Sequence, residues 1–170
     1  RQVGNILHST ALFYGYCMFS TLVASTPWPE KPGSRSALGP CPGTATAMAV
    51  AELASQQKLL VVVVPSSASA AALERELPLF SSAPLNILTL PDWETLPYDN
   101  LSPHQDIVSE RLATFHQLQD IATGILIVPI ATLMQLTPPV HYVAGNSLVL
   151  VVGQALDSKT LIHTLALNGY

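Results

Sequence analysis

Three carboxylates that could perform chemistry stand close together in one short stretch: Asp92, Glu94 and Asp99. They could pair as general acid and base, or together hold a hard metal ion. Because the stretch follows a predicted strand, it should lie at the carboxyl edge of a parallel sheet, where α/β proteins bind ligands. The alternative that we favour is a solvated acidic loop pinned by Trp93 and Tyr98. In that case Trp93 is a buried anchor, and an exposed Asp92 contributes little to stability.

A glycine-containing turn before a helix is the second candidate site. Gly39 and Gly43 lie where a phosphate-binding loop has glycines, and Thr46 lies where it has a hydroxyl residue. Such a loop needs a Lys just before that hydroxyl, but this chain has Ala45 and no lysine between positions 32 and 57. Two prolines in the turn also lack the N–H groups that cradle phosphate. A nucleotide site is the functional interpretation; we predict instead a degenerate P-loop that binds no cofactor.

The other residues that could bind a metal or act as nucleophiles are scattered. The histidines that follow the turn are His104, His116, His141 and His163. None of them shares a ligand spacing with another His or Cys. Cys17 and Cys41 have neither metal-site spacing nor the pattern of a disulfide framework, and no serine lies in a nucleophile elbow. The residues alone predict no catalytic set and no metal site.

The charge of the chain argues against a nucleic-acid surface. Over 170 residues the net charge is −4 and the pI about 5.6, with only 11% of the residues charged. The Lys and Arg residues are scattered, whereas binding to a phosphate backbone needs clustered positive charge. A hydrophobic fraction of 49% favours a buried core over disorder. We therefore expect about one folded domain that binds DNA weakly by itself.

From Leu38 onward, helix-like and strand-like stretches alternate. The predicted helices cover residues 46–57, 66–77, 103 onward and 131–136, and the predicted strands cover 59–64, 86–90 and 125–129. The continuous β-branched run at 59–64 is typical of a strand buried on both faces. Strands that alternate with helices imply crossover connections and a parallel sheet. The sequence thus predicts an α/β fold.

The helix after the acidic loop has a clear predicted start. Ser102 is the expected N-cap, Pro103 the first helical residue, and Gln105 the partner in a capping box. His104 would lie in the first turn, where the helix dipole disfavours a protonated imidazole. The expected apolar face consists of Ile107, Leu112, Phe115 and Leu118.

The two ends of the sequence differ from this middle part. Residues 1–37 form an irregular lead-in, and the apolar run at 11–24 is too short to span a bilayer. Met18 is a candidate start, in which case residues 1–17 are not native; a signal peptide, and with it a secreted or tethered protein, is the alternative. At the other end, a predicted strand at 147–152, a turn before it, and a helix at 159–167 capped by Asp157 or Ser158 open a second, truncated subdomain.

One long motif, LPDWETLPYDNLSPHQDIVSERLATFHQL, resembles the N-terminal module of the bacterial transcription-repair coupling factors. The similarity runs from about Met18 to Tyr170, and GILIVPIATLMQLTPP and LVLVVGQALDSKTLIHTLALNGY fit it as well. The residues that match the family motif are Trp93, Glu94, Pro97, Tyr98, Asp99, Ser102, Pro103, His104, Asp106 and Arg111.

The resemblance implies a module similar to the repair protein UvrB. It implies a motor-like α/β subdomain over 38–139 that has lost its ATPase motifs, followed by a second α+β subdomain from 140, truncated at 170. The family protein is a cytoplasmic ATP-dependent DNA translocase that uses ATP with Mg, displaces stalled RNA polymerase and recruits UvrA for nucleotide excision repair. Its UvrA contact lies mostly beyond this chain, and its polymerase and duplex-DNA contacts lie in missing domains. The module also restrains the protein's own motor domains and involves no membrane.

This segment would then be a non-catalytic scaffold and recruitment module. The alternative left open is a small nucleotide- or substrate-binding α/β enzyme that uses the loop from Asp92 to Asp99.

Overall fold

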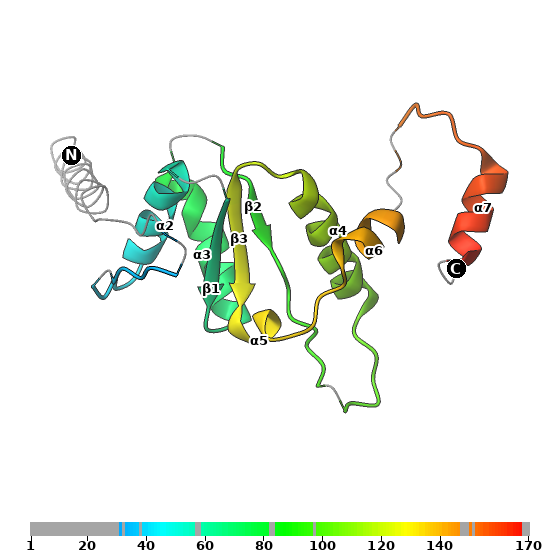
Figure 1. Ribbon diagram of the computed structural model, residues 1–170. Coiled ribbons are helices and arrows are strands. Elements are labelled where there is room, and N and C mark those ends of the chain that lie inside the picture. The colour runs from blue at the N-terminus through cyan, green and yellow to red at the C-terminus, as the bar shows by residue number, and fades with distance from the viewer. Residues whose placement is uncertain are drawn as a thin grey trace, which may run out of the picture.

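The computed structural model describes residues 31–167 except 32, 38, 57–58, 82–83, 97, 147–149 and 151, and it has the predicted α/β architecture (Figure 1). In chain order the elements are α2 (Ala45–Gln56), β1 (Leu59–Val64), α3 (Ser67–Phe80), β2 (Ile87–Thr89), α4 (Gln105–Asp120), β3 (Gly124–Pro129), α5 (Ile130–Leu133), α6 (Val140–Asn146) and α7 (Ser158–Leu167). The strands predicted at 59–64, 86–90 and 125–129 form as β1, β2 and β3, because each is a short apolar run between turn residues.

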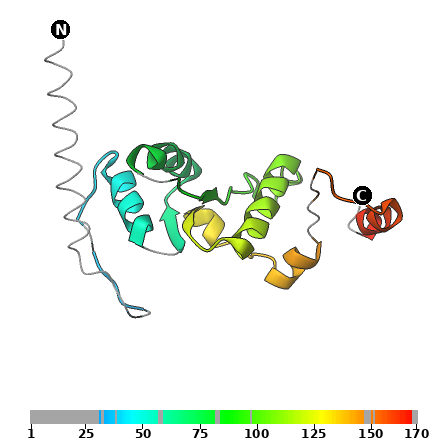
Figure 2. The same ribbon diagram turned by 90° about the horizontal axis from the view of Figure 1, so that it is seen from above.

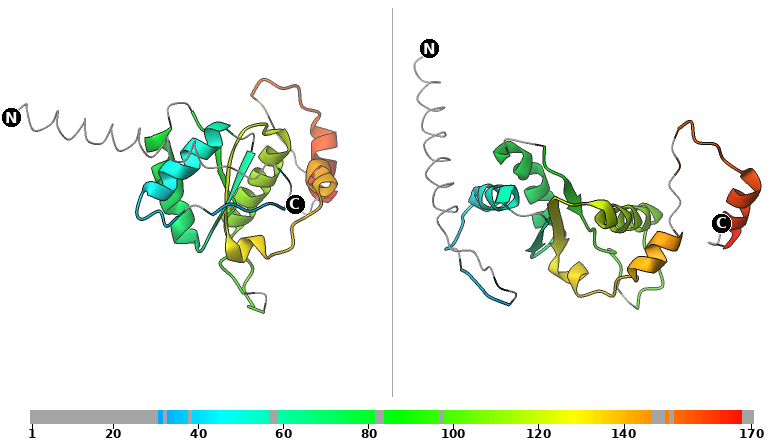
Figure 3. Two further views of the ribbon diagram at one scale, coloured as in Figure 1. Left: turned by 60° about the vertical axis from the view of Figure 1, so that its left-hand side comes forward. Right: turned by 45° about the horizontal axis from the view of Figure 1, so that its top comes forward.

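The three strands make one parallel sheet in the order β1-β3-β2, so β3 lies in the middle. The connection from β1 to β2 carries α3 across the sheet, and the connection from β2 to β3 carries α4 back. Because such crossovers are right-handed, two crossovers that move in opposite directions across the sheet place their helices on opposite faces. Figures 1 and 3 show α2 and α3 on one side of the sheet and α4 on the other, and Figure 2 shows the same layers from above.

The hydrophobic core lies between the α2–α3 layer and one face of the sheet. Ile125 and Ile127 of β3 are fully buried, as is Leu77 of α3. Leu60 and Val62 of β1 pair with these isoleucines and pack against the same cluster. Burying large aliphatic side chains in this way stabilises the fold by roughly 1.5–3 kcal/mol each.

The opposite face of β1 is open to solvent, which corrects the expectation that the strand is buried on both faces. Leu59, Val61 and Val63 keep exposed fractions of 39%, 50% and 46%. The cause is the position of β1 at the edge of the sheet. The crossover helix on that face, α4, lies at the other edge, where the Thr114 hydroxyl donates a 3.0 Å hydrogen bond to the Thr89 carbonyl oxygen.

A close approach between β2 and β3 requires the glycine at the start of β3. A Cβ at Gly124 would lie 2.6 Å from the carbonyl oxygen of Asn86. The same oxygen accepts a 2.8 Å hydrogen bond from Ile125 N. The side chain of Asn86 adds a 3.3 Å hydrogen bond to the carbonyl oxygen of Thr123. The two chain segments therefore touch through their backbones, and a side chain at position 124 would separate them.

The start of α3 agrees with the helix predicted at 66–77. Ser66 is the N-cap, and its hydroxyl accepts a 3.2 Å hydrogen bond from Ser69 N. The helix runs past the predicted end at Leu77, through Pro78 to Phe80. Phe80 packs against the core cluster, which offsets the cost of a proline inside a helix.

The start of α4 differs from the prediction. The N-cap is His104 rather than Ser102, so Pro103 precedes the helix and Gln105 is its first residue. The Nδ1 atom of His104 accepts a 3.3 Å hydrogen bond from Asp106 N, a role that a neutral imidazole nitrogen can fill as a carboxylate or hydroxyl would.

The buried face of α4 also differs from the one expected. Leu112 is 45% exposed, while Arg111 and Thr114 are the residues that α4 buries. Ile107, Phe115 and Leu118 are half-buried beside them. The helix therefore presents polar side chains to the end of β2, because two backbone carbonyls there need donors.

The C-terminal part contains one helix that we did not predict. α6 covers the residues where we expected only a turn, and Val143 is 3% exposed where α6 meets α4. α7 has the predicted cap: the Asp157 carboxylate accepts hydrogen bonds from Lys159 N at 3.2 Å and Thr160 N at 3.4 Å. The predicted strand at 147–152 falls mostly outside the described residues, as do residues 1–30 with the run at 11–24 and Met18.

Candidate functional site

The base of the acidic loop is held by a buried arginine from α4. Arg111 is 2% exposed, and its guanidinium lies 4.2 Å from the centroid of the Trp93 ring and 5.9 Å from that of Phe115. Its Nη1 donates a hydrogen bond to the carbonyl oxygen of Pro91. A guanidinium is suited to this place because it can stack on an indole and donate in its own plane. The predicted role of Trp93 as an anchor of the loop agrees with this contact.

The carboxylate of Asp92 holds the other side of the loop base. One of its oxygens, Oδ1, accepts hydrogen bonds from Trp93 N at 2.9 Å and from Gln135 Nε2 at 2.8 Å. Burial lowers the pKa of Arg111, and the negative charge of Asp92 opposes that shift. Asp92 is thus half-buried and bonded, which corrects the expectation of an exposed aspartate.

The tip of the loop does not behave as predicted, because Tyr98 does not anchor it. Tyr98 is 96% exposed, and Leu96 is 71% exposed. A turn joins Leu96 to Asp99: Asp99 N donates to Leu96 O at 3.0 Å, and the Asp99 carboxylate accepts from Leu96 N at 2.8 Å. Glu94, which is exposed, has a φ of 57°, the left-handed conformation that non-glycine residues adopt rarely.

These contacts decide what the three carboxylates can do. Asp92 and Asp99 are each used to hold backbone N–H groups, and Glu94 stands in solvent. Within the part of the chain that the structure describes, no group of three or more His, Cys, Asp or Glu side chains is placed to hold a metal ion. The arrangement fits a loop whose acids fix its shape, and the alternative of an acid–base pair receives no support from it.

Several polar atoms under the loop are buried without a hydrogen-bond partner among the described residues. They are Arg111 Nε, Thr132 Oγ1 and Gln135 Oε1. Gln135 was not singled out from the sequence, and no local signal could have found it. It lies 43 residues from Asp92 in the chain, and only the fold of β3 and α5 brings the two together.

The glycine-containing turn before α2, where we predicted a degenerate P-loop, is open. The Thr46 hydroxyl donates a 3.0 Å hydrogen bond to the carbonyl oxygen of Cys41, and Ala45 N donates to Pro42 O at 3.3 Å. Gly43 has a φ of 58°, but a Cβ at Gly39 or Gly43 would meet no atom within 4 Å. The hydrogen of the Thr46 hydroxyl is therefore bonded within the turn. The absence of a bound cofactor here stays a prediction.

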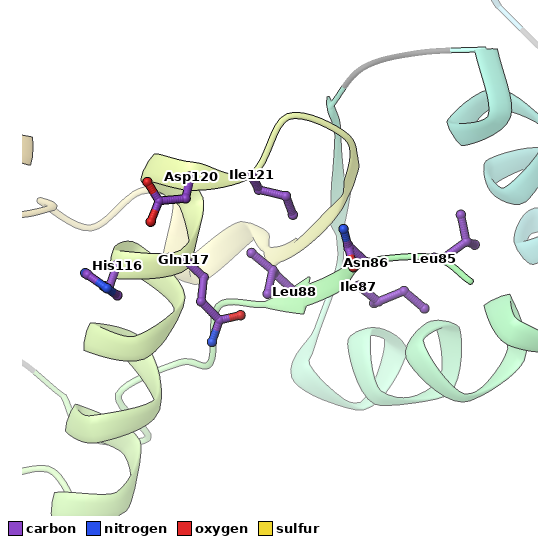
Figure 4. Close-up of a pocket in the computed structure, with 8 residues that line it drawn as sticks. All are labelled: Leu85, Asn86, Ile87, Leu88, His116, Gln117, Asp120 and Ile121. Carbon is purple, nitrogen blue, oxygen red and sulfur yellow. The ribbon is translucent and has the colours of Figure 1, made fainter. Parts of the chain in front are cut away.

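A groove of about 600 Å³ runs along the free edge of β2, beside the C-terminal half of α4 (Figure 4). It is lined by Leu85, Asn86, Ile87, Leu88, His116, Gln117, Asp120 and Ile121. Figure 4 shows the Leu88 and Gln117 side chains between the strand and the helix, with His116 at the far end of the set. The lining mixes aliphatic and amide groups with two titratable side chains, His116 and Asp120, and it indicates no chemistry. No helix among the described residues is long and apolar enough to cross a membrane.

The chain is similar to known proteins over most of its length. No family model matches it. It is 41% identical over 143 residues to the transcription-repair-coupling factor of Escherichia coli (strain K12), and 41% identical over 143 residues to the protein of the same name from Haemophilus influenzae. Each match covers 84% of this chain but only 12% of the relative. The resemblance to the transcription-repair coupling factors is therefore confirmed, for a stretch that makes up a small part of those much longer proteins.

Proposed function

We propose that this chain is the scaffold part of a transcription-repair coupling factor, without catalysis of its own. The observation that carries the proposal is the 41% identity over 84% of the chain to two proteins of that name. In this proposal the whole protein displaces stalled RNA polymerase by ATP-driven translocation on duplex DNA, in the cytoplasm, and recruits UvrA. ATP and Mg act in parts of the protein beyond this chain. The segment from 140 opens the UvrA-recruiting subdomain, and the module restrains the protein's own motor.

The structure of the acidic loop supports a scaffold role over the alternative of a small enzyme. An enzyme would need Asp92 or Asp99 free to exchange a proton or to hold a ligand, and both carboxylates hold backbone N–H groups instead. The Thr46 hydroxyl likewise donates to Cys41 O. The residues that could have done chemistry thus stabilise local structure.

The test is a deletion of residues 38–170 in the full-length protein that carries this segment. We expect the deleted protein to displace a stalled polymerase in the presence of ATP, and to lose both the capture of purified UvrA and the faster repair of the transcribed strand. Loss of polymerase displacement together with loss of ATP hydrolysis would place part of the motor in this segment and contradict the proposal. Retained UvrA capture would contradict the recruiting role alone.

A further inference from the structure

Three large apolar side chains at the tip of the acidic loop lie in water. Leu96, Tyr98 and Leu101 are 71%, 96% and 78% exposed. Figures 1 and 3 show that this stretch projects beyond the carboxyl edge of the sheet, away from the helices. A single exposed apolar residue needs no explanation, but three on one projecting loop form a patch of the kind that marks an interaction site. We call Leu96, Tyr98 and Leu101 the loop tip.

The loop tip is held in shape before any partner arrives. The two hydrogen bonds between Leu96 and Asp99, at 2.8 and 3.0 Å, close the turn from both sides. At the base, Arg111 stacks on Trp93 and Asp92 bonds to Gln135. A surface fixed in this way loses little conformational entropy on binding. Tyrosine is also among the residues that dominate binding energies at protein interfaces.

The charge around the loop tip has one sign. Between positions 92 and 110 the chain has five carboxylates and no Lys or Arg. The exposed members of this set are Glu94, Asp99, Asp106 and Glu110. His104, also exposed, lies 3.3 Å from the Asp106 carboxylate.

The sign of this charge selects among possible partners. Nucleic acid and anionic lipid would be repelled, and a second copy of this chain carries the same sign, with a net charge of −4. A protein surface with an apolar pocket and a rim of Lys and Arg is complementary in both respects. A small apolar centre with a charged rim is the anatomy of contacts that form and dissociate, since permanent interfaces are larger and more apolar.

We propose that the loop tip is a docking surface for a separate protein that presents an apolar pocket rimmed by basic residues. Tyr98 enters the pocket, Leu96 and Leu101 cover its edges, and Glu94 and Asp106 face the basic rim. This role goes beyond the recruitment of UvrA proposed above, because that contact is assigned to residues from 140 onward.

The first test uses benzoylphenylalanine, a photo-crosslinking residue, in place of Tyr98 in the full-length protein. The matched control carries it in place of Leu79, which is 76% exposed on α3. We expect irradiation of cells to give one dominant protein adduct from position 98 and none from position 79. The peptide of the partner protein that is cross-linked to position 98 should lie in a surface rich in Lys and Arg. Equal yields at the two positions, or an adduct with nucleic acid, lipid, the same polypeptide or a second copy, would overturn the proposal.

The second test measures the affinity of the purified full-length protein for the partner found in the first. Tyr98→Ser should weaken binding at least about tenfold, as for an interface hot spot, and Leu79→Ser should leave it unchanged. Glu94→Lys should weaken binding, whereas Asp120→Lys, at the far end of α4, should not. Because Tyr98 is almost fully exposed, its variant should keep the parent's melting temperature. Unchanged affinity for Tyr98→Ser would overturn the proposal. The capture of UvrA, which tests the proposed function, should be the same for Tyr98→Ser and the parent protein.

Discussion

The Arg111 guanidinium lies over the Trp93 indole, 4.2 Å from the ring centroid, and joins α4 to the loop after β2. Arg111 is buried, with 2% exposed, and Trp93 is half-buried. A buried cation costs free energy unless its donors are used. Here the Pro91 carbonyl oxygen and two aromatic faces replace part of the lost water, while Nε has no hydrogen-bond partner among the described residues.

Removing the arginine should unfold the loop base. We expect Arg111→Ala to lower the free energy of unfolding by ~2–5 kcal/mol, the range for large buried side chains. Arg75→Ala, on the exposed face of α3, is the control and should change it by less than about 0.5 kcal/mol. Urea unfolding of the purified chains compares the two. Equal midpoints would mean that the stacked pair contributes nothing.

The two residues that begin the loop should differ in their effects. Trp93→Ala removes apolar area and should cost ~3–5 kcal/mol. Asp92→Ala leaves Trp93 N and Gln135 Nε2 without their acceptor and should cost ~1–3 kcal/mol, more than an exposed aspartate would. Asp92→Asn keeps an oxygen acceptor and should recover most of that loss. Thermal melts would contradict the bonded role of Asp92 if the alanine variant matched the parent.

Gly124 should tolerate no side chain. Gly124→Ala places a Cβ 2.6 Å from the Asn86 carbonyl oxygen and should destabilise the chain by ~1–3 kcal/mol, as overpacking does. Gly39→Ala is the matched control, because a Cβ there meets no atom within 4 Å. A smaller loss for Gly124→Ala than for Gly39→Ala, in the same urea titration, would contradict the close approach of β2 and β3.

The cap of α7 should depend on pH. The hydrogen bond from the Thr160 hydroxyl, followed by that from Lys159 N, lowers the pKa of Asp157 below its ordinary value of 3.8. A carboxylate with a lowered pKa contributes stability above its unfolded pKa and loses it as pH falls through the folded value. The amide resonances of α7 should therefore report fraying only in strong acid. Asp157→Asn should remove that acid step, and a transition near neutral pH would contradict this assignment.

The chain should not hydrolyse ATP. Ala45 stands where a P-loop has Lys, and the Thr46 hydroxyl is bonded to Cys41 O. Phosphate release by the purified chain, with and without duplex DNA, should equal that of a protein-free blank. Release that saturates with ATP and disappears on Thr46→Ala would refute the prediction.

Local chemistry explains which parts of this fold could be predicted. The run at 59–64 has no alternative to a strand, and Ser66 begins α3 because its hydroxyl reaches Ser69 N. The start of α4 could not be fixed, since Ser102 and His104 both can cap and only the path of the loop selects between them.

The errors at the site have a common cause. Whether Tyr98 packs inward, or whether one face of β1 is covered, depends on elements far away in the chain. Asp92 and Gln135, which form a hydrogen bond, are 43 residues apart in the chain. No sequence pattern around either residue predicts this contact. The periodicity of apolar residues describes one helix or strand at a time, so it does not predict contacts between different elements.

The exposed face and free edge of β1 affect how the polypeptide can interact with other chains in the cell. Among the described residues, β1 pairs with β3 alone, and Leu59, Val61 and Val63 are half in water. Six consecutive aliphatic residues with no charge or proline are also the composition that assembles into intermolecular sheets. A ribosome product that ended soon after this segment would offer that strand to chaperones and proteases.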